Sequence, residues 1–362
     1  MQVTSLILTD YRIYSRFKMD FGPGVHFFYG KNGAGKTNLL EALYLASFGR
    51  SFRTRDERDL IIWDEKEAKI EVEFTRNQVS HRLGVILSGR SKRFSFDRHE
   101  VPRRDLIGEL AVVLFMPDDL QLIKGPPLGR RHFIDSELSQ ASRSYFRSLL
   151  QYHRTLRQRN SLLRLERDRR GDGKDLDPWD IQLAHFGAEL IKARRDAIFK
   201  MSKEAGFLYE KIAGDDEKFS LEYLPFGQED EGQGSEENIR ELLFNARKQD
   251  LERVFTSVGP HRDDIRFLLN DRDMRRFASQ GQQRTGVVAL KLGEIEYLHQ
   301  EKGSYPILLL DDLLSELDDS RRQALLSHVG EKVQTFVTGT EKISNLVAHF
   351  HPILKGAKSD AN

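Results

Sequence analysis

Cysteine is absent from this 362-residue chain. The absence excludes disulfides, thiolate-bound metal ions and cysteine nucleophiles, and it suits a reducing compartment. Long apolar runs are also lacking, since no stretch approaches the roughly 20 residues that a membrane-spanning helix needs. The apolar start at 3–8 is interrupted by residues 9–12 before a signal-peptide core could form. We therefore expect a soluble, cytoplasmic protein with no membrane partner.

A large excess of charge is lacking as well. The chain has 57 basic and 56 acidic residues, a net charge of +1, so its bulk charge does not indicate a nucleic-acid partner. Residues 141–170 nevertheless contain nine arginines against two acids (9 − 2 = +7), and 215–237 contain nine acids against one lysine. The arginine block favours either contact with DNA phosphates or a solvated helix face, and charge alone does not separate the two.

A complete Gly-x-x-x-x-Gly-Lys-Thr pattern occupies residues 30–37. It predicts a nucleotide phosphate loop in which backbone amides surround the phosphates, Lys36 supplies positive charge and Thr37 contacts Mg²⁺. A strand expected at 25–29 and a helix expected at 37–48 give the loop suitable neighbours, and a chance glycine turn is the alternative. The predicted nucleotide-binding residues are Gly30, Lys31, Asn32, Gly33, Ala34, Gly35, Lys36 and Thr37.

The acidic partner of this loop lies near the other end of the chain. Residues 305–310 predict an apolar strand, which Asp311 and Asp312 follow. Asp311 suits a magnesium ligand beside Thr37, and Asp312 suits a group that polarises the attacking water. The alternative is that both acids only cap a turn. The separation indicates that the chain leaves the nucleotide-binding sheet, builds another structure and returns.

The intervening chain has its own pattern. A strand is expected at 3–8, and short runs at 68–74, 80–87 and 93–96 predict an antiparallel meander. Beyond proline and glycine breaks, the pattern predicts a long helical hairpin, with helices at 130–139, 142–165 and 178–206. A polar loop is expected at 227–235. The return is predicted to comprise a helix at 282–300, a strand at 305–310, a helix at 320–329 and a strand at 335–338.

Ser279 occupies a cap position before the 282–300 helix, which by itself predicts only a capped helix. Together with Asp311-Asp312 and Ser-Glu-Leu-Asp at 315–318, the Ser-x-Gly-Gln pattern at 279–282 resembles the signature, Walker B and D-loop motifs of ABC-type ATPases of chromosome maintenance and repair. Resemblance to the bacterial RecF family of recombination mediators extends over nearly the whole chain, in the blocks 30–41, 49–53, 259–264, 279–284 and 310–318.

The resemblance implies an α/β fold, an ABC-type P-loop ATPase head with an antiparallel β subdomain and an inserted, mainly helical arm. The head would comprise 1–126 and 256–362, and the arm 127–255. A homodimer closed around ATP is also implied, in which Ser279 and Gln282 act across the interface. The residues implied to act within their own subunit are Lys36, Thr37, Asp311 and Asp312.

Two residues depart from the general ABC pattern. Asp312 stands where the wider superfamily usually has glutamate, and Gln280 replaces the first of two signature glycines. The shorter side chain of Asp312 is expected to hold water less well. We therefore predict a weak, DNA-stimulated ATP hydrolysis that serves as a switch.

The resemblance further implies ATP and Mg²⁺ as ligands, double-stranded and gapped DNA as partners, and mediator proteins of the RecR and RecO type. The implied role is recombinational DNA repair and replication restart, including the SOS response, by helping to load a recombinase. Two alternatives stay open, an SMC-like structural DNA clamp and a metabolic P-loop kinase. Weaker candidates are Asp118 as a γ-phosphate sensor, Arg50 and Arg53 as phosphate or DNA contacts, and His261 in a structural role.

Overall fold

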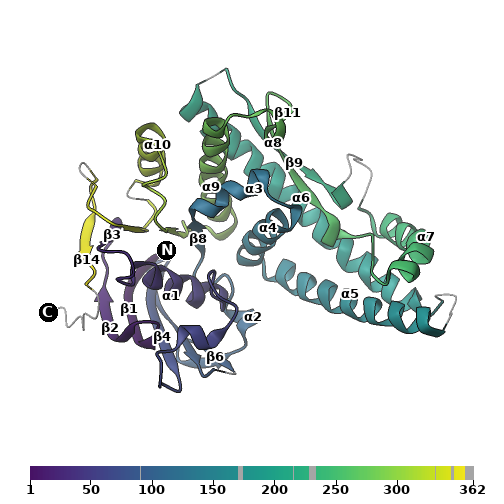
Figure 1. Cartoon of the computed structure of the whole chain (residues 1–362), viewed down its shortest axis with the longest axis horizontal. Helices are drawn as coiled ribbons and strands as arrows, with labels where there is room; N and C mark the ends of the chain where they lie inside the picture. Colours follow the sequence, from purple (N-terminus) through teal and green to yellow (C-terminus); the bar gives the residue numbers. More distant parts are fainter. Residues whose placement is uncertain are drawn as a thin grey trace. The chain divides into compact units, whose positions relative to one another are not determined.

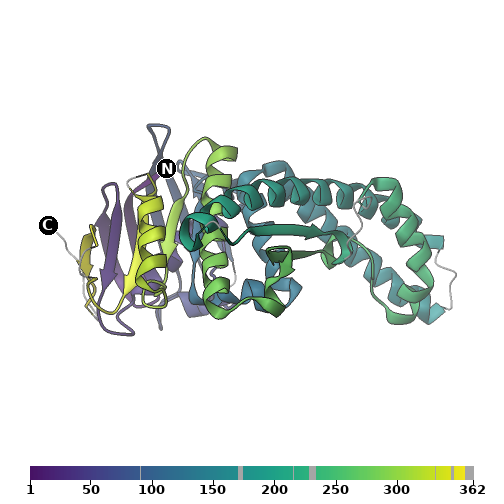
Figure 2. The same ribbon diagram turned by 90° about the horizontal axis from the view of Figure 1, so that it is seen from above.

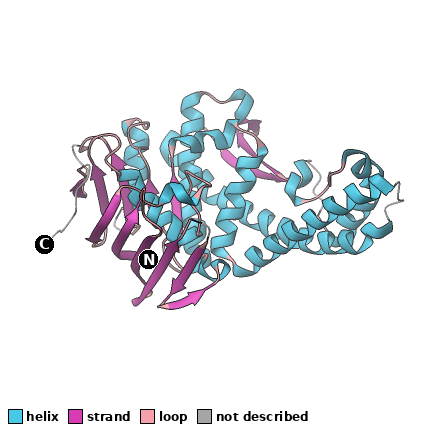
Figure 3. Cartoon of the chain, turned by 60° about the horizontal axis from the view of Figure 1, so that its bottom comes forward, coloured by secondary structure: helices cyan, strands magenta, loops and turns pink. Residues whose placement is uncertain are grey.

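The structure is a computed structural model that describes residues 1–89, 91–169, 174–214, 216–227, 234–330, 332–343 and 346–354. The chain divides into two compact units. The first comprises Met1–Asp119 and Glu294–Asn362, and the second comprises Leu120–Gly293. Strands concentrate in the first unit and helices in the second (Figure 3). Most of the loop predicted at 227–235, namely 228–233, lies outside the described residues.

An antiparallel sheet forms one layer of the first unit. Its six strands within the described residues follow the order β2-β1-β4-β5-β6-β7. They are β1 (Gln2–Tyr11), β2 (Tyr14–Asp20), β4 (Ala68–Arg76), β5 (Val79–Leu87), β6 (Lys92–Phe96) and β7 (His99–Val101). The predicted meander is confirmed by the antiparallel pairing of β4, β5 and β6. Strand β2 was not predicted, because charged residues separate its few core residues, such as Phe17.

A parallel sheet forms the other layer, with the order β14-β3-β13-β12-β8 among the described residues. Its strands are β3 (Val25–Tyr29), β8 (Val112–Phe115), β12 (Ile307–Leu310), β13 (Thr335–Gly339) and β14 (His349–Pro352). The strands predicted at 25–29, 305–310 and 335–338 are confirmed, whereas β14 was not predicted. Because the pairing is parallel, the carboxyl ends of β3, β13 and β12 meet at one edge of the sheet.

Helix α1 (Lys36–Phe48) packs against strands of both sheets, including β4 and β13. All of its residues except Thr37 are buried, as expected for a helix that is covered on every side. Gly49 ends the helix with a left-handed φ of 65°, a conformation that glycine adopts without a steric penalty. Three further elements of the chain are η1 (Glu57–Leu60), α2 (Arg103–Leu106) and α10 (Asp319–Val329), and α10 is labelled in Figure 1.

The second unit contains the predicted helical hairpin, formed by α5 (Arg143–Arg169) and α6 (Asp177–Ala213). Ser148 donates to Glu189 and Arg159 donates to Asp180, so the two helices run antiparallel. The neighbouring elements are η2 (Pro117–Leu120), α3 (Gln121–Lys124), α4 (Pro127–Ala141), η3 (Lys174–Leu176), η4 (Pro225–Gly227), α7 (Glu236–Arg253), η5 (Pro260–Arg262) and α8 (Met274–Phe277).

A small antiparallel sheet lies beside α6 (Figure 2), in the order β11-β10-β9 within the described residues. Its strands are β9 (Phe219–Leu224), β10 (Asp264–Leu269) and β11 (Arg272–Asp273). The pairing of β9 with β10 joins residues on both sides of the boundary that the sequence analysis drew at 255. Residues up to Gly293 therefore group with the helices, although the sequence analysis assigned 256–293 to the head. Helix α9 (Gln280–Lys302) crosses this division.

Candidate nucleotide-binding site

The phosphate loop follows β3 directly, and its lysine is held by the loop itself. Lys36 is buried, and its Nζ donates to the carbonyl oxygens of Gly30 at 2.8 Å and Lys31 at 3.1 Å. Residues Lys31, Asn32 and Gly33 are exposed. The loop is therefore exposed at its tip, while its own carbonyl oxygens hold the lysine ammonium in a buried position.

Two loop glycines are required by close neighbours as well as by their backbone angles. Gly30 has φ 152°, and a Cβ there would lie 2.4 Å from the carbonyl oxygen of Ile353. Gly35 has φ 103°, and a Cβ there would lie 2.5 Å from Cδ1 of Ile13. The hydroxyl of Tyr14 also donates to the Gly35 carbonyl at 3.2 Å. The first residues of α1 contain no acid, so its N-terminal amides and dipole favour an anion.

The predicted acidic partner meets the loop at the edge of the parallel sheet. The Thr37 hydroxyl donates to Oδ1 of Asp311 at 2.8 Å. A second hydroxyl, from Thr338 at the end of β13, donates to the same oxygen at 2.9 Å. Sequence reasoning missed Thr338, because only the strand order places β13 between β3 and β12.

Asp312 has a left-handed backbone conformation. Its φ is 51°, a value that aspartate and asparagine adopt more readily than other non-glycine residues, as they do elsewhere in this chain. Its amide donates to the Thr338 hydroxyl at 2.9 Å, and its carbonyl accepts from the Ser315 hydroxyl at 2.9 Å. These bonds hold the backbone while the Asp312 side chain stays exposed to solvent. A carboxylate in this position is accessible to water.

Burial raises the pKa of Asp311 above its ordinary value, and the neighbouring Asp312 carboxylate raises it further. Hydrogen bonds from Thr37 and Thr338 oppose this rise, as does the positive charge of Arg53. The site therefore disfavours the bare carboxylate. A bound cation would favour the charged form of Asp311.

The oxygen atoms at this edge fit Mg²⁺. Thr37 and Asp311 offer a hydroxyl and a carboxylate, and Mg²⁺ prefers oxygen ligands, of which proteins usually supply one or two beside phosphates and water. Among the described residues there is no group of three or more His, Cys, Asp or Glu that could hold a metal ion. A magnesium ion here would therefore also need oxygen atoms from the nucleotide and from water.

The 49–53 block is fastened to α1. Glu41, fully buried on α1, forms an ion pair with Arg12 at 2.7 Å and accepts the hydroxyl of Ser51. Ser51 in turn accepts the amide of Arg53 at 2.9 Å, and the Arg53 side chain donates to Asn38 at 3.2 Å. This arrangement brings Arg53 to the helix that follows the phosphate loop. From the sequence, the contacts of Arg53 could not be assigned.

Two weaker candidates have clear positions. Asp118 follows β8, whose Phe115 pairs with Leu310 immediately before Asp311, and Asp118 is exposed. Its segment therefore starts at the same sheet edge. His261 lies between the Tyr152 hydroxyl, 2.7 Å from Nδ1, and the Thr256 carbonyl, 2.9 Å from Nε2. Burial lowers the pKa of His261 to about 4, and both ring nitrogens are used, as expected for a structural histidine.

Ser279 and Gln282 belong to the second unit, and they bind each other at the start of α9. The Ser279 amide donates to Oε1 of Gln282 at 2.8 Å, and the Gln282 amide donates to the Ser279 hydroxyl at 3.2 Å. This reciprocal pair is a capping box. The cap predicted at Ser279 is present, and Ser279 remains exposed.

The arginine block divides into two kinds of residue. Arg159 is fully buried and pairs with Asp180 and Asp250, each at 2.6 Å. Arg143, Arg147, Arg154, Arg157, Arg164 and Arg167 are exposed along α5. The side chains of Arg169 and Arg170 lie outside the described part. The exposed arginines give α5 a basic face without excluding either interpretation of the block.

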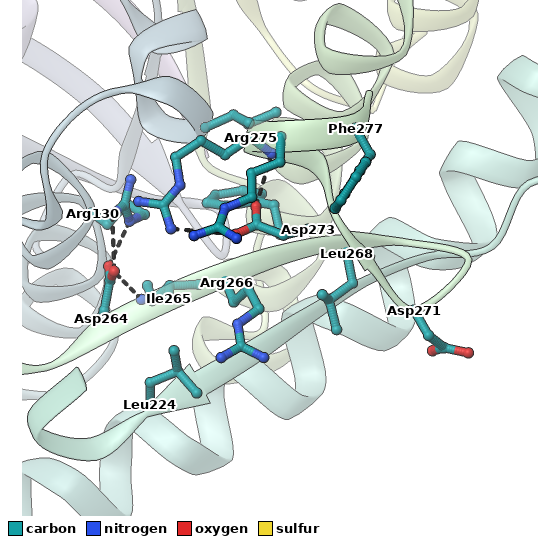
Figure 4. A pocket seen from close by; sticks show the side chains of 13 residues that line it. Arg130, Leu224, Asp264, Ile265, Arg266, Leu268, Asp271, Asp273, Arg275 and Phe277 are labelled. Carbon is teal, nitrogen blue, oxygen red and sulfur yellow. Dashed lines mark hydrogen bonds and ion pairs between the residues drawn. The ribbon is translucent and has the colours of Figure 1, made fainter. Parts of the chain in front are cut away.

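A cavity of about 400 Å³ lies beside α8 in the second unit (Figure 4). In it Arg130 faces Asp264 with two hydrogen bonds of 2.6 and 3.0 Å, and Arg275 lies 3.3 Å from Asp273. A third arginine, Arg266, is paired with a glutamate outside the lining residues. Acids therefore compensate most of the positive charge in the cavity.

A family model described as RecF/RecN/SMC N terminal domain matches residues 2–350. The chain is 40% identical to a DNA replication and repair protein RecF from Natranaerobius thermophilus over 94% of this chain and 91% of that protein. It belongs to the RecF family. A RecF from Latilactobacillus sakei is 42% identical, with 94% and 92% of the two chains covered.

Solved structures agree with this assignment. A structure of the recombination mediator protein RecF with ATP, described in the RecFOR pathway, has a TM-score of 0.90 and 33% identity, covering 98% of this chain and 96% of that chain. An Smc head bound to a domain of ScpA has a TM-score of 0.56 at 14% identity, with 98% and 96% covered, which is a likeness of fold alone. The α/β ABC-type head predicted from the sequence is therefore the fold of this RecF-family chain. No helix among the described residues has the length and hydropathy needed to cross a membrane.

Proposed function

We propose that this RecF-family chain is an ATP-gated DNA-binding protein of recombinational repair and replication restart. The observation that carries the proposal is the meeting of Lys36, Thr37 and Asp311 at one sheet edge, with the Thr37 hydroxyl 2.8 Å from Asp311. A relative that is 33% identical binds ATP according to its description, which supports ATP as the nucleotide.

Hydrolysis of ATP by this site is a transfer of the γ-phosphoryl group to water. Lys36 and the loop amides would hold the phosphates, Thr37 and Asp311 would hold Mg²⁺, and the exposed carboxylate of Asp312 would orient the water. The ion would neutralise charge on the phosphate oxygens. Because aspartate reaches less far than glutamate, the proposed turnover is slow and resets a switch.

Dimerisation supplies the other half of the proposed switch. Ser279 is exposed at the N-terminal end of α9, a position that favours contact with anions. We place Ser279 and Gln282 of one subunit against the nucleotide of a second subunit. ATP would then stabilise the homodimer, and hydrolysis to ADP would release it.

The proposed DNA contact is electrostatic. Exposed arginines along α5 suit the backbone of double-stranded or gapped DNA, and such contacts carry no base sequence information. Partners of the RecR and RecO type, and help in loading a recombinase, are proposed because the RecF relative is described as part of the RecFOR pathway. DNA repair of this kind, including the SOS response, would place the protein in the cytoplasm.

Sedimentation velocity with ATP, with ADP and with ATP plus gapped DNA tests the proposal. The protein is expected to sediment with twice the monomer mass when ATP is present and with the monomer mass when ADP is present. Gapped DNA should favour the ATP-bound dimer. Lys36→Ala serves as the control that cannot respond to ATP. A mass that never changes with nucleotide contradicts the gating mechanism.

The same preparation separates the alternatives. An SMC-like clamp would dimerise and bind DNA without promoting recombinase loading onto gapped DNA. A metabolic kinase would transfer phosphate to a small molecule, whereas the proposed function predicts release of inorganic phosphate that duplex DNA stimulates.

A further inference from the structure

Both polar atoms of the Gln282 side chain have hydrogen-bond partners in this structure. Its oxygen accepts the Ser279 amide at 2.8 Å, and its Nε2 donates to Oε1 of Glu217 at 2.6 Å. Glu217 therefore holds one of the two N–H groups of Nε2. The contacts of Gln282 therefore point toward Ser279 on one side and toward Glu217 on the other.

Glu217 connects this pair to the long helix α6. Its second oxygen, Oε2, accepts the hydroxyl of Tyr209 at 2.7 Å. Tyr209 lies on α6, is fully buried and stacks on Phe219 with ring centroids 5.2 Å apart. One carboxylate thus accepts a hydrogen bond from α6 and another from the start of α9.

The segment that carries Glu217 is anchored by the small sheet. The Lys218 amide donates to Oδ1 of Asn270 at 2.8 Å, and the Asn270 amide donates to the Lys218 carbonyl at 2.8 Å. Glu217 is half-buried between these contacts. These bonds tie the segment of Glu217 to the small sheet without the use of Gln282. The sheet is itself bonded to α6, where the Ser202 hydroxyl accepts the Leu221 amide at 2.8 Å.

The other end of α6 holds the arginine helix. Asp180 accepts the buried guanidinium of Arg159 on α5, and it lies 29 residues before Tyr209 on the same helix. At about 1.5 Å per residue, α6 extends for about 44 Å between these two contacts. A single helix therefore joins α5 to the carboxylate that holds Gln282.

We infer that Glu217 is a positioning residue, which fastens the Ser279 loop to α6 through Gln282. On this assignment Gln282 contributes to the shared nucleotide site by holding Ser279 in its cap. A displacement of α6 caused by DNA on α5 would move Glu217 and so change the presentation of Ser279. The role in ATP-dependent pairing rests on the proposed function, whereas the positioning itself does not require nucleotide.

Hydrogen exchange of the full-length, nucleotide-free protein tests the positioning directly. In Glu217→Ala, the amides of Ser279 and Gln282 should exchange roughly five- to thirty-fold faster, because a half-buried hydrogen-bond network is broken. Exchange in α7 should not change. Glu222→Ala, which removes a glutamate from β9 in the same unit, is the matched control.

Conservative variants test the same contacts if Glu217→Ala folds poorly. Glu217→Gln retains an oxygen for Gln282 and an NH₂ group that can donate to Tyr209, so exchange close to wild type is expected. Tyr209→Phe removes one donor and should raise exchange at 279–282 by a smaller factor. Glu217→Ala and Gln282→Ala should not be additive, because both break the same connection.

The ATP concentration needed for half-maximal dimerisation should rise several-fold in Glu217→Ala, with ATP binding to the monomer unchanged. Unchanged exchange at 279–282, or additive effects in the double variant, would overturn the positioning role even if dimerisation responds to ATP. If exchange responds as expected but the mass never changes with ATP, the proposed function fails and the positioning role stands.

Discussion

Thr37 and Asp311 are 274 positions apart in the chain, yet the Thr37 hydroxyl lies 2.8 Å from Oδ1 of Asp311. The contact exists because β3 and β12 end at the same edge of a parallel sheet, with β13 between them. Thr338 at the end of β13 donates to the same carboxylate oxygen and accepts the amide of Asp312. A residue outside the recognised motifs therefore contacts both the candidate magnesium ligand, Asp311, and the candidate catalytic residue, Asp312.

Thr338→Val tests that arrangement, because valine keeps the shape of threonine and removes the hydroxyl. Asp311 loses one of its two hydroxyl donors and the Asp312 amide loses its acceptor, at a cost of about 1–3 kcal/mol. We expect ATP hydrolysis to fall roughly ten-fold and the Mg²⁺ requirement to rise. Steady-state phosphate release over a Mg²⁺ titration measures both effects.

Thr335→Val is the matched control. Thr335 lies on the same strand and is buried, but its hydroxyl donates to the carbonyl of Val333, away from Asp311. The Thr335→Val variant should lose as much stability as Thr338→Val, but its ATP hydrolysis should keep the Mg²⁺ dependence of the wild type. Equal losses of activity in the two variants would contradict a specific role for Thr338.

The strand, the glycine loop and the helix of the phosphate site could be predicted because their patterns are local. The strand at 25–29 is reproduced residue for residue, and the predicted helix at 37–48 differs from α1 only by Lys36 at its start. Asp311 was recognised because it follows an apolar strand. These features depend on residue patterns within short segments, which can be read from a single sequence.

Contacts between distant segments could not be predicted in the same way. Thr338 has no motif of its own, and its role arises from the strand order. Glu217 lies in an acidic stretch that gives no sign of its contact with Gln282. Arg159 looks like its arginine neighbours in the sequence, although it is fully buried. Each of these residues has a role that depends on a partner many positions away.

Ser279→Arg tests the shared nucleotide site. The long cation should block contact with a second subunit, so ATP-dependent dimers should be lost while ATP binding to the monomer is retained. The substitution also removes a helix cap, worth about 1 kcal/mol. Light scattering with and without ATP, together with binding of a fluorescent ATP analogue, separates dimerisation from nucleotide binding.

Ser235→Arg controls for the lost cap. Ser235 caps α7 by accepting the amide of Asn238 at 3.1 Å, as Ser279 caps α9. This variant should show a comparable loss of stability and normal dimers. Unchanged dimerisation of Ser279→Arg would count against the shared site.

A histidine cluster between β3 and β14 should make stability depend on pH. Nε2 of His351 lies 3.1 Å from Nδ1 of His26, and the ring of His349 stacks on His26. Burial, followed by the neighbouring histidines, lowers the pKa of His351 to about 4 from an ordinary value of 6.5. Between these values the unfolded chain binds a proton that the folded chain does not.

Stability should therefore be full above pH 6.5 and should fall as the pH is lowered toward 4. Because His351 is only partly buried, we expect a loss of about 1 kcal/mol by pH 5 after allowing for solvent screening. Urea unfolding at pH 7.5 and 5 measures the loss. His351→Gln should reduce the dependence, whereas the exposed His99→Gln should not; equal pH dependence in all three proteins would exclude the cluster as its source.

Substitution of the buried arginine of α5 should affect stability, whereas substitution of its exposed arginines should not. Arg159→Leu leaves the buried Asp250 without its cation, whereas Asp180 keeps its ion pair with Arg247. Loss of the cation of a buried carboxylate should cost about 3–5 kcal/mol of unfolding free energy. Arg157→Ala combined with Arg164→Ala removes two exposed charges, so the melting temperature should stay unchanged.

If α5 binds DNA phosphates, this double variant should lower affinity and reduce the slope of log K against log salt by about 2, since each lost phosphate contact contributes about 0.9. Fluorescence anisotropy with a gapped duplex between 50 and 200 mM salt, a range in which such slopes are resolved, measures both quantities. Arg240→Ala, which removes an exposed arginine from α7, controls for net charge. The slope reports the number of counterions released, and so the number of phosphates that the protein neutralises. A double variant with the same slope as the wild type would therefore mean that the basic face of α5 is only solvated.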